Sequence, residues 1–185
     1  MYRPLKQKIV SVLVDNQANV LTRVISMFGR RGFNIDSLTV STTSNPKYSR
    51  ITIVFSATEQ SMQQIITQTQ KLEVVKDVTI LTRENALYRE LLLIRVLTKD
   101  REERRAVKEI VDIYRGKIVD LSQGSLIVEM TGAPQKINGF LDVMQEFETK
   151  DLCRTGVTGI EGINETHRWY DDGEDPEAYD FDEEY

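Results

Sequence analysis

Apolar residues between Lys8 and Leu81 change spacing several times, and each spacing is typical of one kind of element. The run from Lys8 to Val14 is almost continuously apolar, which is typical of a strand in the middle of a sheet. From Val20 to Phe28 the apolar residues recur at helical spacing, and a glycine follows at position 32, as is common after a helix. The remaining patterns predict strands at 34–41, 50–55 and 74–81, with a helix at 59–72 between the last two.

A second run of elements in the same order follows. The spacing predicts strands at 90–98, 117–121, 125–130 and 151–160, with helices at 101–115 and 134–147. Pro134 begins the last helix, where its missing N–H does no harm. Both halves therefore read βαββαβ, and the predicted class is α+β, with two consecutive ferredoxin-like units.

A short sequence match supports an internal duplication. Arg31-Gly32-x-x-x-Asp36 reappears as Arg115-Gly116-x-x-x-Asp120, an offset of 84 positions (32 to 116) that also places Leu13 over Leu97. We expect a first domain at 1–82, a second at 83–162 and an acidic tail at 163–185, with the seam between the domains at 82–87. Units of this size have marginal cores, so they are expected to support each other or to oligomerise.

The acidic tail changes how the net charge is interpreted. The chain carries −5, but residues 171–185 hold nine acids and no base, which leaves +4 for the remainder. That remainder has no concentrated Lys/Arg run, so nucleic-acid binding is not expected. The tail composition favours disorder, although its aromatic residues leave a partner-binding role open. Those aromatics are Trp169, Tyr170, Tyr179, Phe181 and Tyr185.

Residues suited to catalysis are few. His167 is the only histidine and lies near the tail, so a nucleophile paired with histidine has no base in the folded core. Cys153 is the only cysteine; we expect it to be a buried structural thiol, and it suits a reducing cytoplasm. These two side chains cannot make a zinc site, and no phosphate-binding glycine loop occurs. The longest apolar runs are strand-sized, so no membrane span is expected.

The loop before the first helix is the candidate binding site. Asn16 and Asn19 flank a helix N-terminus, where free N–H groups favour a carboxylate, and Asn16 offers an oxygen to an ammonium group. Asn34, which starts the next strand, is expected to face the same end of the sheet. The competing interpretation is that Asn16 and Asn19 only cap the helix. At the offset of 84 the second unit has Asp100 and Glu103 instead, so only the first unit could hold an amino-acid effector.

Several of these segments resemble a known family. Residues 14–24 (VDNQANVLTRV), 28–40 (FGRRGFNIDSLTV), 49–52 (SRIT), 114–120 (YRGKIVD) and 154–157 (RTGV) are similar to the small regulatory subunit of acetolactate synthase, also called acetohydroxyacid synthase. The resemblance covers residues 8–162. It implies an ACT domain followed by a second ferredoxin-like domain, and a homodimer whose ACT sheets join edge to edge with effector sites at the interface.

The resemblance also implies a division of labour in branched-chain amino-acid (valine and isoleucine) biosynthesis. A separate large subunit carries thiamine diphosphate, magnesium and FAD and condenses pyruvate into acetolactate. The small subunit holds no cofactor, has no catalytic residue, raises the partner's activity and usually confers inhibition by valine. The alternatives left open are an ACT-type amino-acid sensor for another enzyme, a nucleic-acid-binding module and, least supported, an enzyme with its own site.

Matching by position transfers the family's effector contacts to this chain. They would be Asn16, the backbone around Asn19, Val20 and Leu21, and Asn34 with Ile35. Asn19 stands where the family usually has glycine. Asparagine tolerates a left-handed backbone, but its side chain takes up space beside the expected carboxylate position, so we expect weaker or altered effector binding.

Overall fold

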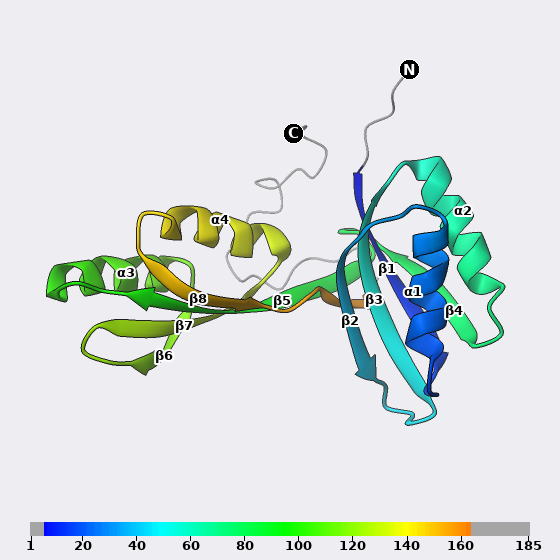
Figure 1. The fold of residues 1–185 in the computed structure, drawn as a ribbon, viewed down its shortest axis with the longest axis horizontal. Coiled ribbons are helices and arrows are strands. Elements are labelled where there is room, and N and C mark those ends of the chain that lie inside the picture. The colour runs from blue at the N-terminus through cyan, green and yellow to red at the C-terminus, as the bar shows by residue number, and fades with distance from the viewer. Residues whose placement is uncertain (1–5, 164–185) are drawn as a thin grey trace, which may run out of the picture.

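The computed structural model describes residues 6–163, which form two units of helix and sheet (Figure 1). The first unit consists of β1 (Lys6–Asp15), α1 (Val20–Arg30), β2 (Ile35–Thr42), β3 (Tyr48–Ala57), α2 (Glu59–Gln70) and β4 (Val75–Leu81). The second unit consists of β5 (Ala86–Leu97), α3 (Arg101–Ile113), β6 (Lys117–Leu121), β7 (Ser125–Gly132), α4 (Pro134–Met144), β8 (Thr149–Arg154) and β9 (Thr158–Glu161).

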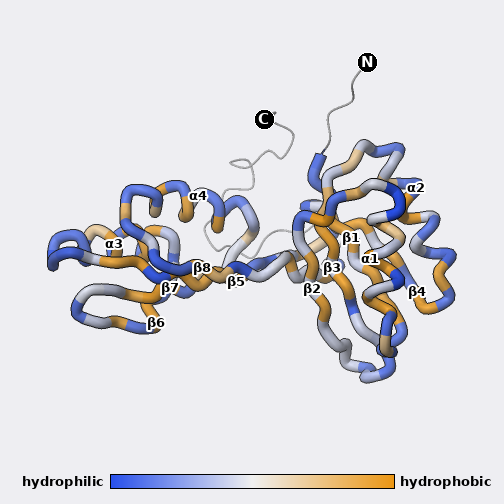
Figure 2. The backbone as a smooth tube through the Cα atoms, viewed as in Figure 1, coloured by the Kyte–Doolittle hydropathy of each residue, from blue (hydrophilic) through white to orange (hydrophobic). Residues whose placement is uncertain are grey.

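The first unit is an antiparallel sheet in the order β2-β3-β1-β4, with α1 and α2 on one face (Figure 1). Alternate residues of β1 (Val10, Val12 and Val14) are buried in the core, as the period of a strand requires. Phe28 of α1 meets Phe55 of β3 edge to face, with 5.2 Å between ring centroids. Hydrophobic positions lie along the strands of both sheets (Figure 2).

The second unit repeats this arrangement with strand order β6-β7-β5-β8. Leu92, Ile94 and Val96 of β5 are buried and pack with Val107 of α3 and Phe140 of α4. Each unit thus has its own hydrophobic core. The predicted α+β class and the two ferredoxin-like units are confirmed.

The last expected strand is in fact two strands. β8 pairs with residues 92–96 of β5, and β9 continues along the same strand by pairing with residues 86–89. Thr155 bridges the two, because its N–H donates to the Leu91 carbonyl and its hydroxyl accepts from the Leu91 N–H. β5 therefore starts at Ala86 instead of residue 90, and it runs from one unit into the other (Figure 1).

A small apolar cluster joins the units. Val54 and Leu81 of the first unit pack with Ala86, Tyr88 and Val157 of the second, and all five are at most 4% exposed. Burial raises the pKa of the Tyr88 phenol, as expected for a group whose charged form would lose solvation. Since Val54 points away from the helices that cover its neighbours on β3, the cluster covers the helix-free face of the first sheet.

The connection after β8 also passes close to β2. A Cβ atom added to Gly156 would lie 2.9 Å from the Ser37 hydroxyl oxygen, 3.0 Å from Thr39 Cγ2 and 3.1 Å from the Leu38 carbonyl. The first separation is shorter than real Cβ contacts and the other two are tighter than most, so a side chain here would require its neighbours to shift. The two units are therefore held together by backbone approach as well as by apolar contact.

The structure corrects the uniform offset of 84 between the units. The bulge of β1 lies at Leu13/Val14 and that of β5 at Arg95/Val96, which is an offset of 82 (14 to 96). The N-cap residues of α1 and α3 are Asn19 and Asp100, an offset of 81 (19 to 100). The offsets differ because the strand-to-helix connections, 16–19 and 98–100, differ in length, and because α3 has 13 residues whereas α1 has 11.

The paired glycines also have different roles. Gly32 has φ of 75°, whereas the corresponding left-handed position in the second unit is Arg115, with φ of 54°. Gly116 instead lies close under neighbouring side chains, since an added Cβ would be 3.1 Å from Val111 and 3.2 Å from Met130. The sequence match therefore marks equivalent turns but not equivalent residues.

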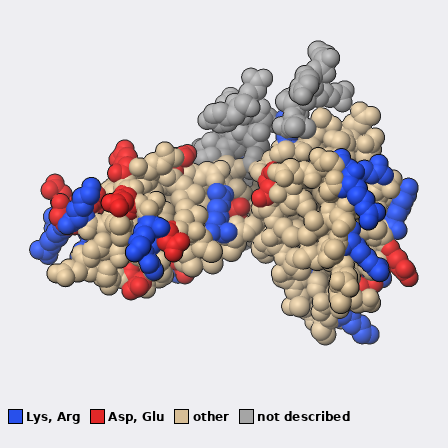
Figure 3. Space-filling model, in the orientation of Figure 1, with Lys and Arg blue, Asp and Glu red and all other residues tan. Residues whose placement is uncertain are grey.

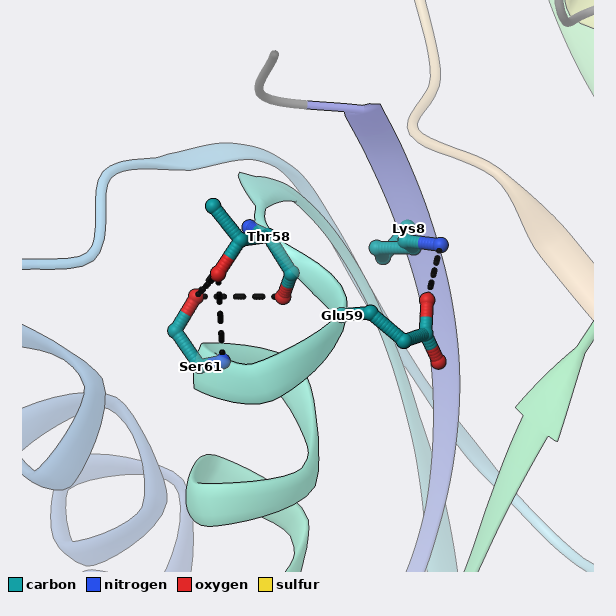
Figure 4. Close-up of polar contacts among 4 residues, drawn as sticks. All are labelled: Lys8, Thr58, Glu59 and Ser61. Atoms are coloured by element: carbon teal, nitrogen blue, oxygen red, sulfur yellow. Dashed lines mark hydrogen bonds and ion pairs between the residues drawn. The ribbon is translucent and has the colours of Figure 1, made fainter. Parts of the chain in front are cut away.

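Local signals explain where α2 begins. Thr58 accepts a hydrogen bond from the Ser61 N–H, and the Ser61 hydroxyl accepts one from the Thr58 N–H, which is a capping box (Figure 4). Next to it, Lys8 Nζ lies 2.9 Å from Glu59 Oε2. The hydrogen bond from Lys8 holds the pKa of the Glu59 carboxyl below its ordinary value. This pair fixes the start of α2 against the start of β1.

Candidate functional site

Asn16 is anchored to the loop between β2 and β3. Its main-chain N–H donates to the Lys47 carbonyl at 2.7 Å, and its side-chain Nδ2 donates to the Pro46 carbonyl at 3.0 Å. The amide nitrogen is therefore engaged, and the Oδ1 atom is left as an acceptor. Recognition of an ammonium group by Asn16 stays a prediction. The loop at Pro46 and Lys47, which holds Asn16 in place, was not predicted from the sequence.

Asn19 takes the left-handed conformation that a glycine would adopt easily. Its φ is 66° and ψ is 2°, and its side chain makes no capping hydrogen bond although it occupies the N-cap position of α1. The interpretation of Asn19 as an ordinary side-chain cap is therefore wrong. Its own carbonyl does accept the first helical bond, from the Arg23 N–H at 3.1 Å.

Helices α2 and α3 differ from α1 because a side chain caps each of them, whereas α4, like α1, has no side-chain cap. In α3, the Asp100 side chain accepts from the N–H groups of Glu102 and Glu103 at 2.9 and 2.8 Å. In α2, Thr58 plays the same part. No side chain occupies the N–H groups of the first turn of α1, so they remain able to bind an anion. The first helices of the two units therefore differ at their N-termini, as expected. In the second unit the residue at the N-cap position is Asp100.

Val20 and Leu21, the first two residues of α1, differ in how far their side chains are exposed at the candidate site. Val20 is 4% exposed and belongs to the core, so only its main-chain N–H faces the turn, whereas Leu21 is 37% exposed. Nearby, Asp15 Oδ2 lies 2.9 Å from Lys76 Nζ, and the hydrogen bond raises the pKa of the Lys76 ammonium. The Asp15 carboxylate at the edge of the turn is therefore paired with the Lys76 ammonium group.

Asn34 does not face the same end of the sheet as Asn16 in one chain, so that expectation is wrong. Ile35 pairs with Phe55, which lies opposite Lys8, whereas Asp15 lies opposite Tyr48 at the other end of the sheet. The eight residues of β2 span about 26 Å. The reason is topological: β2 runs parallel to β1, so its start lies beside the start of β1.

The immediate contacts of Asn34 are local. Its Nδ2 donates to Asp36 Oδ1 at 3.3 Å, and Asp36 also accepts from the Ser56 hydroxyl at 3.1 Å. Ile35 is half-buried against the core of the first unit. Asn34 is exposed, so its remaining amide groups are accessible to another molecule.

The structure places one of the two side chains that the sequence analysis weighed for catalysis. Cys153 is exposed, which corrects the expectation of a buried thiol. It lies on the edge strand β8 opposite Leu93, and both point to the helix-free face of the second sheet. Within the described residues there is no cluster of three or more His, Cys, Asp or Glu side chains arranged for a metal. His167 lies outside the described residues.

The helices of the described part of the chain are also too short or too polar to cross a membrane.

Two family models match the chain, one for each unit. A model described as an AHAS (acetohydroxyacid synthase) small subunit-like ACT domain matches residues 10–77. A model described as the small subunit of acetolactate synthase matches residues 89–163. The first unit is therefore an ACT domain, which agrees with its strand order and its open helix N-terminus.

Similar proteins extend over both units. A probable acetolactate synthase small subunit of Archaeoglobus fulgidus is 44% identical over 151 residues, covering 82% of this chain and 94% of that protein. The acetolactate synthase small subunit of Mycolicibacterium smegmatis is 39% identical, with 82% and 88% covered. The crystal structure of the small subunit from Thermotoga maritima matches with a TM-score of 0.78 at 35% identity, over 86% of this chain and 99% of that one. The chain belongs to the family of acetolactate synthase small subunits.

Proposed function

We propose that this chain is the regulatory subunit of an acetolactate synthase. It binds a large subunit that carries the thiamine diphosphate, magnesium and FAD, raises the activity of that subunit and makes it sensitive to valine or a related branched-chain amino acid. Membership in the small-subunit family over both units is the observation that supports this most strongly. The domain division at residue 82 is part of the same proposal, with the first unit as the sensor.

The turn at residues 16–19 suits the charged groups of an α-amino acid. The free N–H groups at the start of α1 attract the carboxylate, and Asn16 Oδ1 accepts from the ammonium. The side chain of Leu21 offers apolar contact beside them. No other helix in the described residues has a left-handed N-cap residue, so the first unit is the better candidate.

The edge of β2 supports a homodimer. β2 is the outer strand of its sheet, Val40 on it is 48% exposed, and Asp36 is its only charged residue. Long uncharged edges are normally covered, because their free N–H and carbonyl groups pair with other strands. The opposite edge, β4, carries Lys76 and Asp77, which discourage such pairing. A second copy of β2 is the natural partner.

Such pairing would bring the two separated asparagines together. Two copies of β2 related by a two-fold axis run antiparallel, so the start of one lies beside the end of the other. The end of β2 leads into the loop that holds Asn16, through the carbonyls of Pro46 and Lys47. Asn34 of one protomer would then approach Asn16 of its partner, and each effector site would draw on both chains.

Reconstitution tests this function. The chain is mixed with an acetolactate synthase large subunit, and acetolactate formation is measured with and without valine, leucine and isoleucine. We expect stimulation by the chain and inhibition by at least one of these amino acids. Absence of stimulation would contradict the proposal and favour an ACT sensor for another enzyme. Asn16→Ala is the matched variant, and it should keep the stimulation but lose the inhibition.

A further inference from the structure

A basic groove runs along the helix layer of the first unit, and neither the fold nor the effector site explains it. The cavity between α1 and α2 has a volume of about 610 Å³. Its lining includes Arg23, Arg30, Arg31 and Lys71, and no acidic residue. In Figure 3, Lys and Arg gather along the outer side of the unit on the right, with Asp or Glu below them, whereas the two signs are interspersed over the unit on the left.

The four cations have no partners within the structure. None of them forms an ion pair or a side-chain hydrogen bond with another residue of the range 6–163, and all four are exposed. Like charges at this density repel one another, so leaving them unpaired costs stability unless an anionic group binds. The floor of the groove is different: Met27 is half-buried and its sulfur lies 4.0 Å from the Thr69 hydroxyl.

The C-terminal segment of the same chain has the complementary chemistry. Residues 171–185 carry nine acids and no base, with aromatics interleaved in the run Tyr179-Asp180-Phe181-Asp182. Carboxylates suit the arginines at the rim, and an aromatic ring suits a methionine sulfur on the floor. The small-subunit family model ends at residue 163, so this segment lies beyond the part of the chain that matches the family.

Chain length allows the segment to reach the groove. The Gly162 N–H donates to the Asn85 carbonyl at 2.8 Å, just beyond the end of β4 that pairs with the start of β1. α1 runs antiparallel to β1 and ends at Arg30, at this same end of the sheet. The residues between 162 and 171 span up to about 30 Å, more than the roughly 10 Å between a sheet and the layer packed on it.

We propose that the acidic C-terminal segment, residues 171–185, docks intramolecularly on the basic groove formed by Arg23, Arg30, Arg31 and Lys71. Asn19 also lines this groove, so the docked segment lies beside the effector turn and places negative charge near the start of α1. That charge competes with an effector carboxylate for the same positive end of the helix. The segment is thus a built-in modulator of effector binding.

Carbodiimide cross-linking of the full-length chain tests the docking, because it joins a carboxylate to a lysine in direct contact. Lys71 should cross-link to Asp or Glu of residues 171–184, and the exposed lysines Lys117 and Lys150 of the second unit are the internal controls. Exposed ion pairs each stabilise a contact only modestly, so the loss of two in Arg30→Gln/Arg31→Gln should lower the Lys71 yield about five- to tenfold. Arg101→Gln/Arg105→Gln on α3 is the matched control and should leave the yield unchanged.

Mixing chains of two isotopic masses identifies the source of the segment. Cross-linked peptides should carry one mass only, and mixed-mass products in proportion to random pairing would overturn the intramolecular docking. Equal yields at Lys71, Lys117 and Lys150 would also overturn it, as would yields insensitive to salt. Cross-links from the segment to the large subunit alone, with none at Lys71 in the free chain, would assign it to the partner instead.

Binding of a labelled peptide with the sequence of residues 171–185 gives a second measurement. The tail variant Asp180→Asn/Asp182→Asn/Glu183→Gln/Glu184→Gln should bind this peptide more tightly than the unaltered chain does, since four of the nine carboxylates that compete for the groove are neutralised. Equal affinity for both chains would contradict the docking. Neither result depends on acetolactate synthase activity, so the docking and the regulatory function fail independently.

Discussion

The Thr39 hydroxyl donates to the Val157 carbonyl at 2.6 Å, which connects the edge strand of the ACT unit to the segment between β8 and β9. The Val157 N–H in turn donates to the Ser37 hydroxyl at 3.3 Å. β2 is the strand that we propose as the dimer edge, and its first residue follows Asn34. The strand that follows Asn34, a residue of the proposed effector site, is therefore in direct contact with the second unit.

Gly156→Ala should weaken this contact. The added methyl group lies 2.9 Å from the Ser37 hydroxyl oxygen, and overpacking of this kind costs about 1–3 kcal/mol. We expect valine to bind the variant as it binds the unaltered chain, while its inhibition of the large subunit is reduced. Calorimetry and the acetolactate assay measure the two effects separately. Gly124→Ala is the control, because nothing lies within 4 Å of its added Cβ, and full inhibition in Gly156→Ala would refute the coupling.

Arg154 ties three parts of the second unit together. Its guanidinium binds Glu90, and its Nε lies 2.7 Å from the Glu90 carboxylate, whose side chain is only 6% exposed. Its Nη1 donates to Asn138 Oδ1 at 2.8 Å, on α4. Arg154→Met leaves the buried carboxylate uncompensated, so the free energy of unfolding should fall by about 3–5 kcal/mol in urea titration.

The double variant Glu90→Leu/Arg154→Met is the matched comparison for that prediction. Removing both charges removes the unpaired carboxylate, so the double variant should be more stable than Arg154→Met alone. If it is equally unstable or less stable, the loss in Arg154→Met comes from packing and from the Asn138 contact instead.

Asn19→Gly should strengthen effector binding. Glycine accepts the φ of 66° without strain and removes the side chain beside the carboxylate position, so a three- to tenfold lower Kd for valine is expected, equivalent to about 0.7–1.4 kcal/mol. Asn19→Ala also removes the side-chain amide, but the left-handed backbone costs an alanine about 1 kcal/mol of folding free energy, so its Tm should fall. Tight valine binding that Asn19→Gly leaves unchanged would contradict this role.

Lys8→Met should slightly reduce the loss of folding stability that the chain shows when the pH falls from 7 to 3. The pKa of Glu59 is lowered by Lys8, so the pair stabilises the fold above the ordinary pKa of 4.5 and loses that effect as pH falls through the lower folded value. Glu59 is 61% exposed, so solvent limits the effect to about 0.5 kcal/mol. Urea titrations at pH 7 and pH 3 should show a deficit in Lys8→Met at pH 7 that disappears at pH 3.

Much of the fold was predictable because the signals are local. The alternation of Val10, Val12 and Val14, and the helical spacing from Val20 to Phe28, reflect which side chains face one core. The split between β8 and β9 was not predictable in this way. It depends on Gly156 and Val157 meeting β2, a contact between residues about 120 positions apart in the sequence.

The candidate site was predicted in part. The left-handed backbone at Asn19 follows from residue type and position, and the structure has it. The binding role of Asn16 stays a prediction, beside the observed hydrogen bond from its side chain to the Pro46 carbonyl. The placement of Asn34 was wrong, because strand direction within a sheet is set by topology and not by nearness in sequence. The basic groove was missed for a similar reason: Lys71 joins the arginines of α1 only when α2 packs beside it.

Mixed dimers test most directly whether each effector site is shared between two chains. Asn16→Ala and Asn34→Ala should each abolish valine binding as homodimers. A mixed dimer of the two variants has one site that lacks both asparagines and one that has both, so calorimetry should recover binding at half the stoichiometry of the unaltered chain, with its normal Kd. A mixed dimer that binds no valine would show that the two asparagines do not form a site across the dimer.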